Sequence, residues 1–385
     1  MKILALTSIR SEYDLLSSLF QKLHLDPNID LQLLVGGAHN SPTFGLTRKD
    51  IEGDGFNILM NIESLLDADT NSSRLKSASI LLMSSIEIVK QYSPDLIIYA
   101  GDREEVMIGA LLGGYLSIPT LHFFGGDHAS DGHIDNPIRH AVSKLSTVHF
   151  VSTLEHERRL CALGEPKQRI FNIGSVALDK FSDIPPSKGI VSDIALKEIT
   201  RPIALFIFHP VEEELGNVQQ IVRNTIDALI DEGFHVFVGK PNTDHGNTAI
   251  RDVIGDIVTE TEHISVYGNL PRTEFVQLFK ASQLIVGNSS AGVLEGASIS
   301  ISCLNVGGRQ KGGFCGGNVV FVDANKESVL NGLKQIKTCE FQQKLSKVVN
   351  PYGDGKASEQ AYRLITTTNF QSLMLKKEDP LHYDK

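Results

Sequence analysis

The chain has 385 residues, more than one hydrophobic core usually supports, so its length predicts two domains of ordinary size. Hydrophobic residues make up 41% and charged residues 21%, the values of a globular protein rather than of a disordered chain. Thirty-six Lys and Arg against 46 Asp and Glu give a net charge of −10, which argues against a partner that is a nucleic acid or an anionic membrane.

Cysteine usage and hydropathy predict the compartment. The four cysteines show neither CxxC pairing nor metal-type spacing, which favours a reducing compartment over a disulfide framework. The apolar run at the N-terminus is too short for a secretory signal, and no apolar stretch approaches the ~20 residues that span a bilayer. We therefore expect a cytoplasmic protein that is not embedded in a membrane.

Short apolar runs alternate with segments of helical period, which is typical of βα units with parallel strands. The strands expected in the first half are 3–7, 31–35, 96–100, 120–124, 148–151 and 169–173, with helices over 13–23, 77–90, 106–115 and 137–145. Those expected in the second half are 203–208, 235–238, 265–267, 284–286, 302–304 and 319–322, with helices over 218–230, 272–280, 291–297 and 326–337.

The pattern predicts an α/β protein with two Rossmann-like, doubly wound domains, residues 1–181 and 202–357. Residues 182–201 contain two adjacent prolines and no clear strand, so we expect a linker region there. A helix and tail over 358–385 follow the second domain and could pack back on the first.

Ligands of open parallel sheets bind beyond the carboxyl ends of the strands. In the first half, Arg10 follows the first expected strand, and Asp102 with Arg103 follows the strand 96–100. In the second half, His209 and Asn242 follow two further strands. We expect these loops to line one active-site cleft between the two domains.

The turn Gly287-Asn288-Ser289-Ser290 predicts a phosphate site, because small residues admit a phosphate and the next helix offers unpaired N–H groups. An ordinary serine cap is the alternative. Glu295, about one helical turn further, could accept bonds from ribose hydroxyls, and Arg309 could reach a phosphate, so a nucleotide-type ligand is favoured. Neither GxGxxG after the first strand nor a P-loop motif occurs, which argues against dinucleotide-dependent dehydrogenases and P-loop NTPases.

Ionisable residues crowd the segment 123–140, among them Asp127, Asp135, Arg139 and His140. Their spacing does not match a metal-ligand motif, so we expect no metal and acid/base carboxylates instead. Asp102 at a strand end is a further candidate acid or base, with a helix-capping carboxylate as the alternative. For His209, a cleft-facing side chain and a cap of the following helix both remain open.

Taken together, these motifs resemble the hydrolysing UDP-N-acetylglucosamine 2-epimerases, the branch that makes mannosamine-type sugars for sialic and legionaminic acids. The resemblance runs from Ile3 to about Thr367. It implies a glycosyltransferase-B-like fold, no cofactor, no metal and a homodimer or homotetramer. The implied substrate is a UDP-linked acetamido sugar, either UDP-N-acetylglucosamine or UDP-N,N'-diacetylbacillosamine.

The resemblance also implies the chemistry. The C2 proton of the sugar is removed, UDP leaves from C1, and water adds to the resulting glycal so that C2 is inverted. Asp102 and Asp135 match the family's acid/base carboxylates, and His209 matches a histidine near the diphosphate. The positions that match nucleotide-binding residues of the family are Arg10, Arg103, Asn242, Ser289, Ser290, Glu295 and Arg309.

One position departs from the family pattern. Members with a His-x-Glu-Gly-Gly motif carry a catalytic glutamate two residues after the histidine, and here the motif begins at His122 and has Phe124 at that place. Either Asp127 takes the role of this glutamate, or the chain handles a different sugar.

Three other activities remain open. A non-hydrolysing 2-epimerase is disfavoured by the Ile-Asp-x-x-x-Arg-His pattern, which begins at Ile134. A glycosyltransferase on the same scaffold would need an acceptor, and a nucleotide-sugar sensor would bind without turnover.

Overall fold

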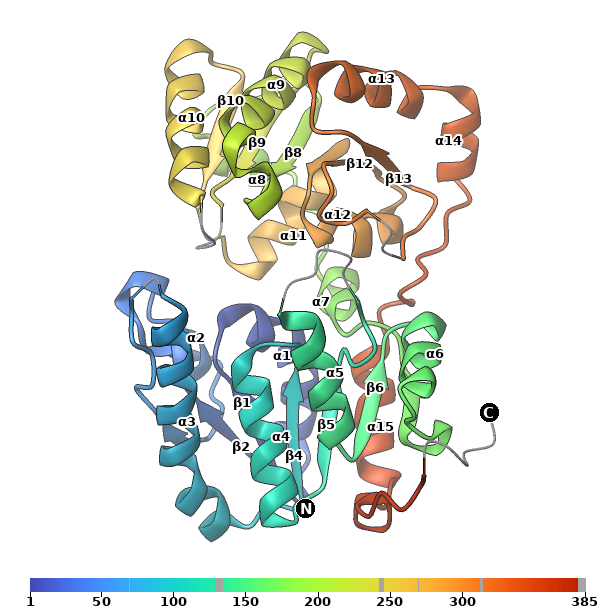
Figure 1. The fold of residues 1–385 in the computed structure, drawn as a ribbon. Helices are drawn as coiled ribbons and strands as arrows, with labels where there is room; N and C mark the ends of the chain where they lie inside the picture. Colours follow the sequence, from blue (N-terminus) through green and yellow to red (C-terminus); the bar gives the residue numbers. More distant parts are fainter. Residues whose placement is uncertain (69, 129–133, 242–245, 269, 312–313, 380–385) are drawn as a thin grey trace. The chain divides into compact units, whose positions relative to one another are not determined.

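The computed structural model describes residues 1–68, 70–128, 134–241, 246–268, 270–311 and 314–379. They form two compact units, each built around its own parallel sheet with helices on both faces (Figure 1). The first unit is made mainly of residues 1–128, 134–179 and 352–379, and the second of 180–351. Among the described residues, no helix has the length and hydrophobicity needed to cross a membrane.

The first unit contains a seven-stranded sheet in the described part of the chain, with strand order β3-β2-β1-β4-β5-β6-β7 and all pairs parallel. Its strands are β1 (Lys2–Thr7), β2 (Asp30–Val35), β3 (Ile58–Asn61), β4 (Leu96–Ala100), β5 (Thr120–Phe123), β6 (Val148–Val151) and β7 (Ile170–Asn172). Its helices are α1 (Arg10–Leu25), α2 (Arg48–Gly53), α3 (Asn71–Tyr92), α4 (Glu104–Leu116), α5 (Asp135–Leu145), α6 (Leu154–Ala162), α15 (Ala357–Thr367) and the start of α7 (Ala177–Asp183).

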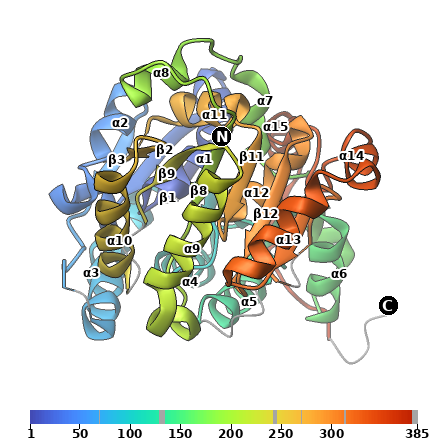
Figure 2. The same cartoon turned by 90° about the horizontal axis from the view of Figure 1, so that it is seen from above.

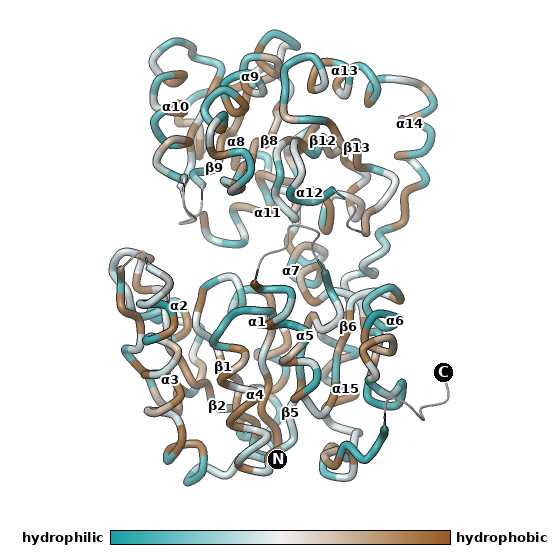
Figure 3. The backbone as a smooth tube through the Cα atoms, in the orientation of Figure 1, coloured by the Kyte–Doolittle hydropathy of each residue, from teal (hydrophilic) through white to brown (hydrophobic). Residues whose placement is uncertain are grey.

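Burial on both faces explains why these strands read as continuous apolar runs. Every residue of β4 is buried, and its side chains alternate between two hydrophobic clusters. One cluster contains residues of α1 and α15, and the other contains residues of α3 and α4. Figure 3 accordingly shows hydrophobic strands in the interior of this unit.

The end of the chain completes the first unit. Ile365 of α15 lies in the cluster under α1, and the Tyr362 hydroxyl donates to Asp26 at 2.8 Å. Beyond α15, the Lys376 ammonium donates to the buried carboxylate of Glu165 at 2.7 Å. The C-terminal segment is therefore anchored to the first unit at two places.

The second unit contains a six-stranded sheet in its described residues, with strand order β10-β9-β8-β11-β12-β13 and all pairs parallel. Its strands are β8 (Ile203–Ile207), β9 (His235–Gly239), β10 (Ile264–Tyr267), β11 (Leu284–Gly287), β12 (Ser302–Val306) and β13 (Val319–Val322). Its helices are α8 (Ile190–Ala195), α9 (Val218–Asp231), α10 (Asn247–Glu260), α11 (Arg272–Ala281), α12 (Ser290–Leu294), α13 (Lys326–Ile336) and α14 (Cys339–Leu345).

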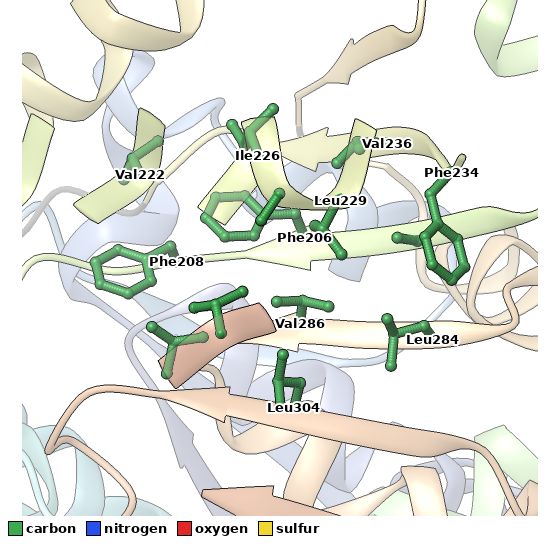
Figure 4. Packing of buried hydrophobic residues seen from close by; sticks show 14 of the residues in the cluster. Phe206, Phe208, Val222, Ile226, Leu229, Phe234, Val236, Leu284, Val286 and Leu304 are labelled. Atoms are coloured by element: carbon green, nitrogen blue, oxygen red, sulfur yellow. The ribbon is translucent and has the colours of Figure 1, made fainter. Parts of the chain in front are cut away.

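The second core also lies on both faces of its sheet. Phe206 and Phe208 stack with ring centroids 6.0 Å apart, and Val286 and Leu304 of the neighbouring strands pack beside them (Figure 4). Helices α9, α10 and α13 cover this face and lie next to one another, as Figure 2 shows from above. Helices α8 and α11 cover the opposite face.

The predicted fold class is confirmed, with differences in detail. Residues 182–201, expected to be a linker, belong to the second unit and carry α8, whose Ile190 is buried against the sheet. The edge strand β3 and helix α10 were missing from the expectation. The helix expected over 291–297 is α12, which ends at Leu294 and gives way to a 3-10 turn over Gly296–Ile299.

Candidate active site

The order of the strands reverses between β1 and β4 in the first unit, because the chain builds the sheet outward in opposite directions from this point. Such a switch point leaves a crevice beyond the carboxyl ends of the two strands. A pocket of about 140 Å³ lies here, lined by residues that follow β1 and β4 and by Phe124 after β5. The topology therefore explains why the pocket occurs at this edge.

Two carboxylates line the pocket among the described residues, Asp102 and Glu12. Glu12 is the third residue of α1, and its Oε2 accepts the backbone N–H of Ser8 at 3.2 Å. Its Oε1 is buried and has no hydrogen-bond partner among the residues that the structure describes. Burial, together with the charge of Glu105, raises the pKa of Glu12 to about 8. The surroundings of Glu12 therefore favour the neutral carboxyl group.

The surroundings of Asp102 favour the ionised carboxylate. Its carboxylate forms an ion pair with Arg139 of α5, whose side chain is only 11% exposed. An arginine in contact with a carboxylate favours the ionised form of that carboxylate. Burial lowers the pKa of the Arg139 guanidinium to about 10, so the arginine remains charged at pH 7. Asp102 is therefore an oriented carboxylate at the pocket.

Asp127 also contacts Arg139, at 3.5 Å, and pairs with His156 Nε2 at 3.3 Å. Burial alone would raise the pKa of Asp127, but the hydrogen bond and charge of His156 lower it below the usual range. Asp127 is absent from the residues that line the pocket. Asp127 therefore lies outside the pocket wall, and its carboxylate is paired with Arg139 and His156.

The remaining sequence-predicted residues of the first unit lie at helix starts near this edge. Asp135 is the first residue of α5, one turn before Arg139. Arg103 precedes α4 and lines the pocket, with its Nε 3.6 Å from Glu105 Oε2. Arg10 begins α1 and forms an ion pair with Asp14 at 3.4 Å.

Phe124 adopts a left-handed backbone conformation with φ 64°, which is uncommon for a bulky residue. Its backbone N–H donates to the Phe150 carbonyl at 3.2 Å, so the residue is still joined to β6. Left-handed geometry costs roughly 1–2 kcal/mol in a residue with a Cβ, and such strain concentrates at functional sites. The strained turn places Phe124 in the wall of the pocket.

The second unit has its own switch point, between β8 and β11. His209 follows β8 and Asn288 follows β11, and the Asn288 side chain joins the two loops. The His209 N–H donates to Asn288 Oδ1 at 2.7 Å, and Asn288 Nδ2 donates to the His209 carbonyl at 2.8 Å. Asn288 is fully buried.

The turn after β11 requires glycine. Gly287 has φ 126°, and a Cβ at this position would collide with the carbonyl oxygen of Ile207 on β8. Ser289 caps α12 by accepting the Ala291 N–H at 3.3 Å, and Ser290 is the first helical residue. The Ser289 hydroxyl thus has the capping role that was the alternative to ligand binding, while Ser290 starts the helix beside it.

Arg309 lies next to the serine turn. Its guanidinium Nη1 donates to the Asn288 carbonyl at 3.2 Å. The loop that carries it is held by Glu214, whose Oε1 accepts the Gly308 N–H at 3.2 Å. The Asn288 side chain therefore holds the His209 backbone, and the Arg309 side chain holds the Asn288 backbone.

Glu295 was expected to accept hydrogen bonds from ribose hydroxyls, and in the structure it pairs with an arginine. It is 4% exposed and forms an ion pair with Arg272, a residue that the sequence analysis did not single out. Burial raises the pKa of Glu295, while the charge of Arg272 opposes this rise. Its Oε2 is buried without a hydrogen-bond partner in the described part of the chain. One carboxylate oxygen of Glu295 thus pairs with Arg272, and the other accepts no hydrogen bond from the described residues.

Asn242, predicted to bind the nucleotide, lies outside the described residues. The described residues contain no group of three His, Cys, Asp or Glu side chains that could hold a metal ion. Glu12 and Arg272 were not among the site residues expected from the sequence. For Glu12, its position two residues after Arg10 on the first turn of a helix was the available signal.

The chain is similar to known proteins over nearly its whole length. The family model described as UDP-N-acetylglucosamine 2-epimerase matches residues 21–366. A UDP-N,N'-diacetylbacillosamine 2-epimerase (hydrolyzing) of Legionella pneumophila is 32% identical over 377 residues, 98% of both chains. A GDP/UDP-N,N'-diacetylbacillosamine 2-epimerase (hydrolyzing) of Campylobacter jejuni is 31% identical over 347 residues, 89% of both chains.

Solved structures share the fold. The UDP-GlcNAc 2-epimerase from Neisseria meningitidis bound to UDP-GlcNAc has a TM-score of 0.80 at 17% identity, covering 96% of this chain and 100% of that chain. The enzyme from Methanocaldococcus jannaschii in complex with UDP-GlcNAc and UDP has a TM-score of 0.76 at 18% identity, with the same coverage.

Proposed function

The chain belongs to the UDP-N-acetylglucosamine 2-epimerase family, and from this premise we propose that it is a hydrolysing epimerase. It converts a UDP-linked 2-acetamido sugar and water into UDP and the free 2-epimeric sugar. Supporting the hydrolysing reaction, the Legionella relative of that description aligns with 98% of this chain.

The reaction has two stages. In the first, a base takes the C2 proton, the C1–O bond to UDP breaks, and a C1=C2 glycal remains. In the second, a proton is added to C2 on the opposite face and water attacks C1. Because a C2 proton without a neighbouring carbonyl is weakly acidic, departure of UDP must run ahead and leave positive charge at C1. Carboxylates beside C1 and C2, and donors on the diphosphate, meet these demands.

The observation that carries the proposal is the pocket at the switch point of the first unit, where Arg139 orients the Asp102 carboxylate. Asp102 and Asp135 serve the chemistry at C1 and C2. His209, Ser290 and Arg309 bind the diphosphate, because hydroxyl, imidazole and guanidinium groups are strong donors to phosphate oxygens. Glu295 binds the ribose hydroxyls. Arg10, Arg103, Ser289 and Asn242 are further nucleotide-binding residues in this proposal.

We propose UDP-N,N'-diacetylbacillosamine as the preferred sugar nucleotide, with UDP-N-acetylglucosamine as the second candidate. Ile9, Leu15 and Phe124 give the pocket an apolar side. Such a surface suits a sugar with a methyl group at C6 and a second acetamido group better than one with hydroxyls at both places. The names of the two bacterial relatives agree with this choice.

The test is incubation with each nucleotide sugar in heavy water, followed by NMR of the products. We expect UDP and a free mannosamine-type sugar with deuterium at C2. A product that keeps its bond to UDP would instead identify a non-hydrolysing epimerase. Absence of both products from any acetamido nucleotide sugar would reject the proposal, and turnover only after an acceptor is added would indicate a glycosyltransferase.

A further inference from the structure

Glu12 is a carboxyl group in the pocket that the proposed mechanism has not used. It shares the pocket wall with Asp102, and its Oε1 is buried without a hydrogen-bond partner among the described residues. A Cβ placed on Gly101 would lie 3.9 Å from this oxygen, so Glu12 Oε1 faces the residue that precedes Asp102. An unsatisfied buried polar atom beside a reactive carboxylate calls for a functional explanation.

Two other carboxylates near the pocket are engaged in ion pairs. Asp102 is paired with Arg139, and Asp127 with Arg139 and His156. Phe124, at the place where an acidic side chain could have reached the pocket, cannot transfer a proton. Glu12 is therefore the carboxyl group in the pocket wall that can donate a proton.

We propose that Glu12 is the catalytic acid of the second stage, the group that protonates C2 of the glycal. This inference rests on the proposed function. The Glu12 O–H bond breaks, and the C1=C2 π electrons form the new C2–H bond. Water then bonds to C1 and releases one proton, which restores the Glu12 carboxyl group, while the proton that the base took from C2 in the first stage passes to solvent and restores the base. Inversion at C2 needs an acid distinct from the base that removed the first proton, and the ionised Asp102 and neutral Glu12 form such a pair.

The surroundings of Glu12 support this assignment. Burial and the charge of Glu105 raise the pKa of Glu12, while Arg103 and the Ser8 N–H oppose the rise. The net pKa of about 8 keeps the proton on Glu12 at neutral pH and lets it leave readily, as efficient acid catalysis requires. Arg103 and Glu105 are the charged groups that act on Glu12, and Asp102 lies in the same pocket wall.

Alternatively, Glu12 only stabilises the start of α1, because a carboxylate at the third position of a helix often caps the preceding turn. Glu12→Gln separates the two roles, since glutamine keeps an oxygen for the Ser8 N–H but cannot donate an acidic proton. Glu359→Gln is the matched control, because Glu359 is also the third residue of a helix in the same unit, α15, and lies outside the pocket.

The experiment follows UDP, glycal and free sugar separately, and also feeds the 2-acetamidoglycal with UDP directly. In Glu12→Gln we expect UDP release to continue and glycal to accumulate, with hydration slowed about 10²–10⁴-fold and the melting temperature unchanged. Glu359→Gln should behave like the native protein. Equal rates of glycal hydration in Glu12→Gln and the native protein, or equal slowing of both stages together with a lower melting temperature, would overturn the inference.

A second measurement does not depend on that variant. Glycal hydration by the native protein should decline as the pH rises through about 8, because Glu12 then loses its proton. In Glu105→Gln the decline should begin at lower pH, since removal of the Glu105 charge lowers the pKa of Glu12. If glycal hydration declined at the same pH in Glu105→Gln and in the native protein, the assignment would be contradicted. If the native protein produces neither UDP nor glycal, the proposed function fails before this test applies.

Discussion

Asn288 binds the backbone of His209 in both directions, donating to its carbonyl oxygen at 2.8 Å and accepting its N–H at 2.7 Å. The two residues follow β8 and β11, the strands on either side of the switch point of the second sheet. One fully buried side chain thus fixes the relative position of the loops that carry His209 and the serine turn.

Asn288→Ala should destabilise the second unit and weaken UDP binding. It leaves a backbone donor and an acceptor of His209 without partners, at a cost of about 1–3 kcal/mol for each unsatisfied group. Urea unfolding and calorimetric titration with UDP measure the two effects. Asn325→Ala removes an exposed helix cap of α13, which follows β13, two strands away from β11; it costs about 1 kcal/mol and should leave UDP binding unchanged. Native UDP affinity in Asn288→Ala would contradict the positioning role.

Asp102→Asn should lower kcat by about 10³-fold or more while UDP binds almost as well as to the native protein, because the amide cannot accept a proton. Steady-state kinetics and UDP titration give the two values. Asp252→Asn, on the exposed surface of α10, is the control and should change neither. A large loss of UDP affinity in Asp102→Asn would mean that Asp102 serves the nucleotide.

Ser290→Ala should show the reverse pattern. Loss of one hydroxyl donor to a charged phosphate weakens UDP binding by about 1.5–3 kcal/mol, roughly 10- to 150-fold in Kd, with a smaller effect on kcat at saturation. The same kinetics and titration apply. If Ser290→Ala and Asp102→Asn lost UDP affinity and kcat in equal proportion, this division of roles would be wrong.

Glu165→Gln should loosen the C-terminal segment. Burial alone would raise the pKa of Glu165, but His149 and Lys376 lower it to about 2. Because the pKa is depressed, its contribution to stability is present above about pH 4.5 and is lost as the pH falls toward 2. We expect Glu165→Gln to reduce the free energy of unfolding by about 3–5 kcal/mol at pH 7.

Urea unfolding at pH 7 and pH 3 checks this expectation, and the difference from the native protein should narrow at pH 3. Glu155 provides the control, because its side chain is 42% exposed and pairs with Arg159 one helical turn away. Glu155→Gln should cost only about 0.3–0.5 kcal/mol. A difference for Glu165→Gln that stayed constant with pH would exclude the charge as its origin.

Gly287→Ala should destabilise the second unit by roughly 3 kcal/mol or more, because backbone strain adds to the collision with Ile207. Gly255→Ala on α10 is the matched control. An added Cβ there meets no atom within 4 Å, so alanine should stabilise the helix by roughly 0.5–1 kcal/mol. Thermal unfolding of both variants tests the contrast, and a neutral Gly287→Ala would show that the turn can relax.

The doubly wound fold was predictable because buried parallel strands leave apolar runs that are bounded by polar loops. The edge strand β3 was missed because its apolar run covers only residues 58–60, and its residues are only partly buried. Helix α10 carried a readable signal, with Ile250, Ile254 and Ile257 spaced along one face. The prolines that suggested a linker mark the start of a segment that buries Ile190.

The candidate site was partly predictable. Strand ends identified Asp102, His209 and the serine turn, because parallel strands deliver their loops to one edge. The ion pair between Asp102 and Arg139 and the buried state of Glu12 depend on side chains from separate helices. Sequence spacing does not encode such contacts, which arise only when α1, α4 and α5 dock on the sheet.

The packing of the C-terminal helix α15 on the first unit affects how the protein folds during translation. Ribosomes deliver the N-terminus first, yet the cluster beneath α1 includes Ala361 and Ile365, which are made after the entire second unit. Until these residues emerge, the nascent first unit exposes the apolar surface that α15 covers. The second unit, encoded without interruption from residue 180 to residue 351, can complete its core earlier.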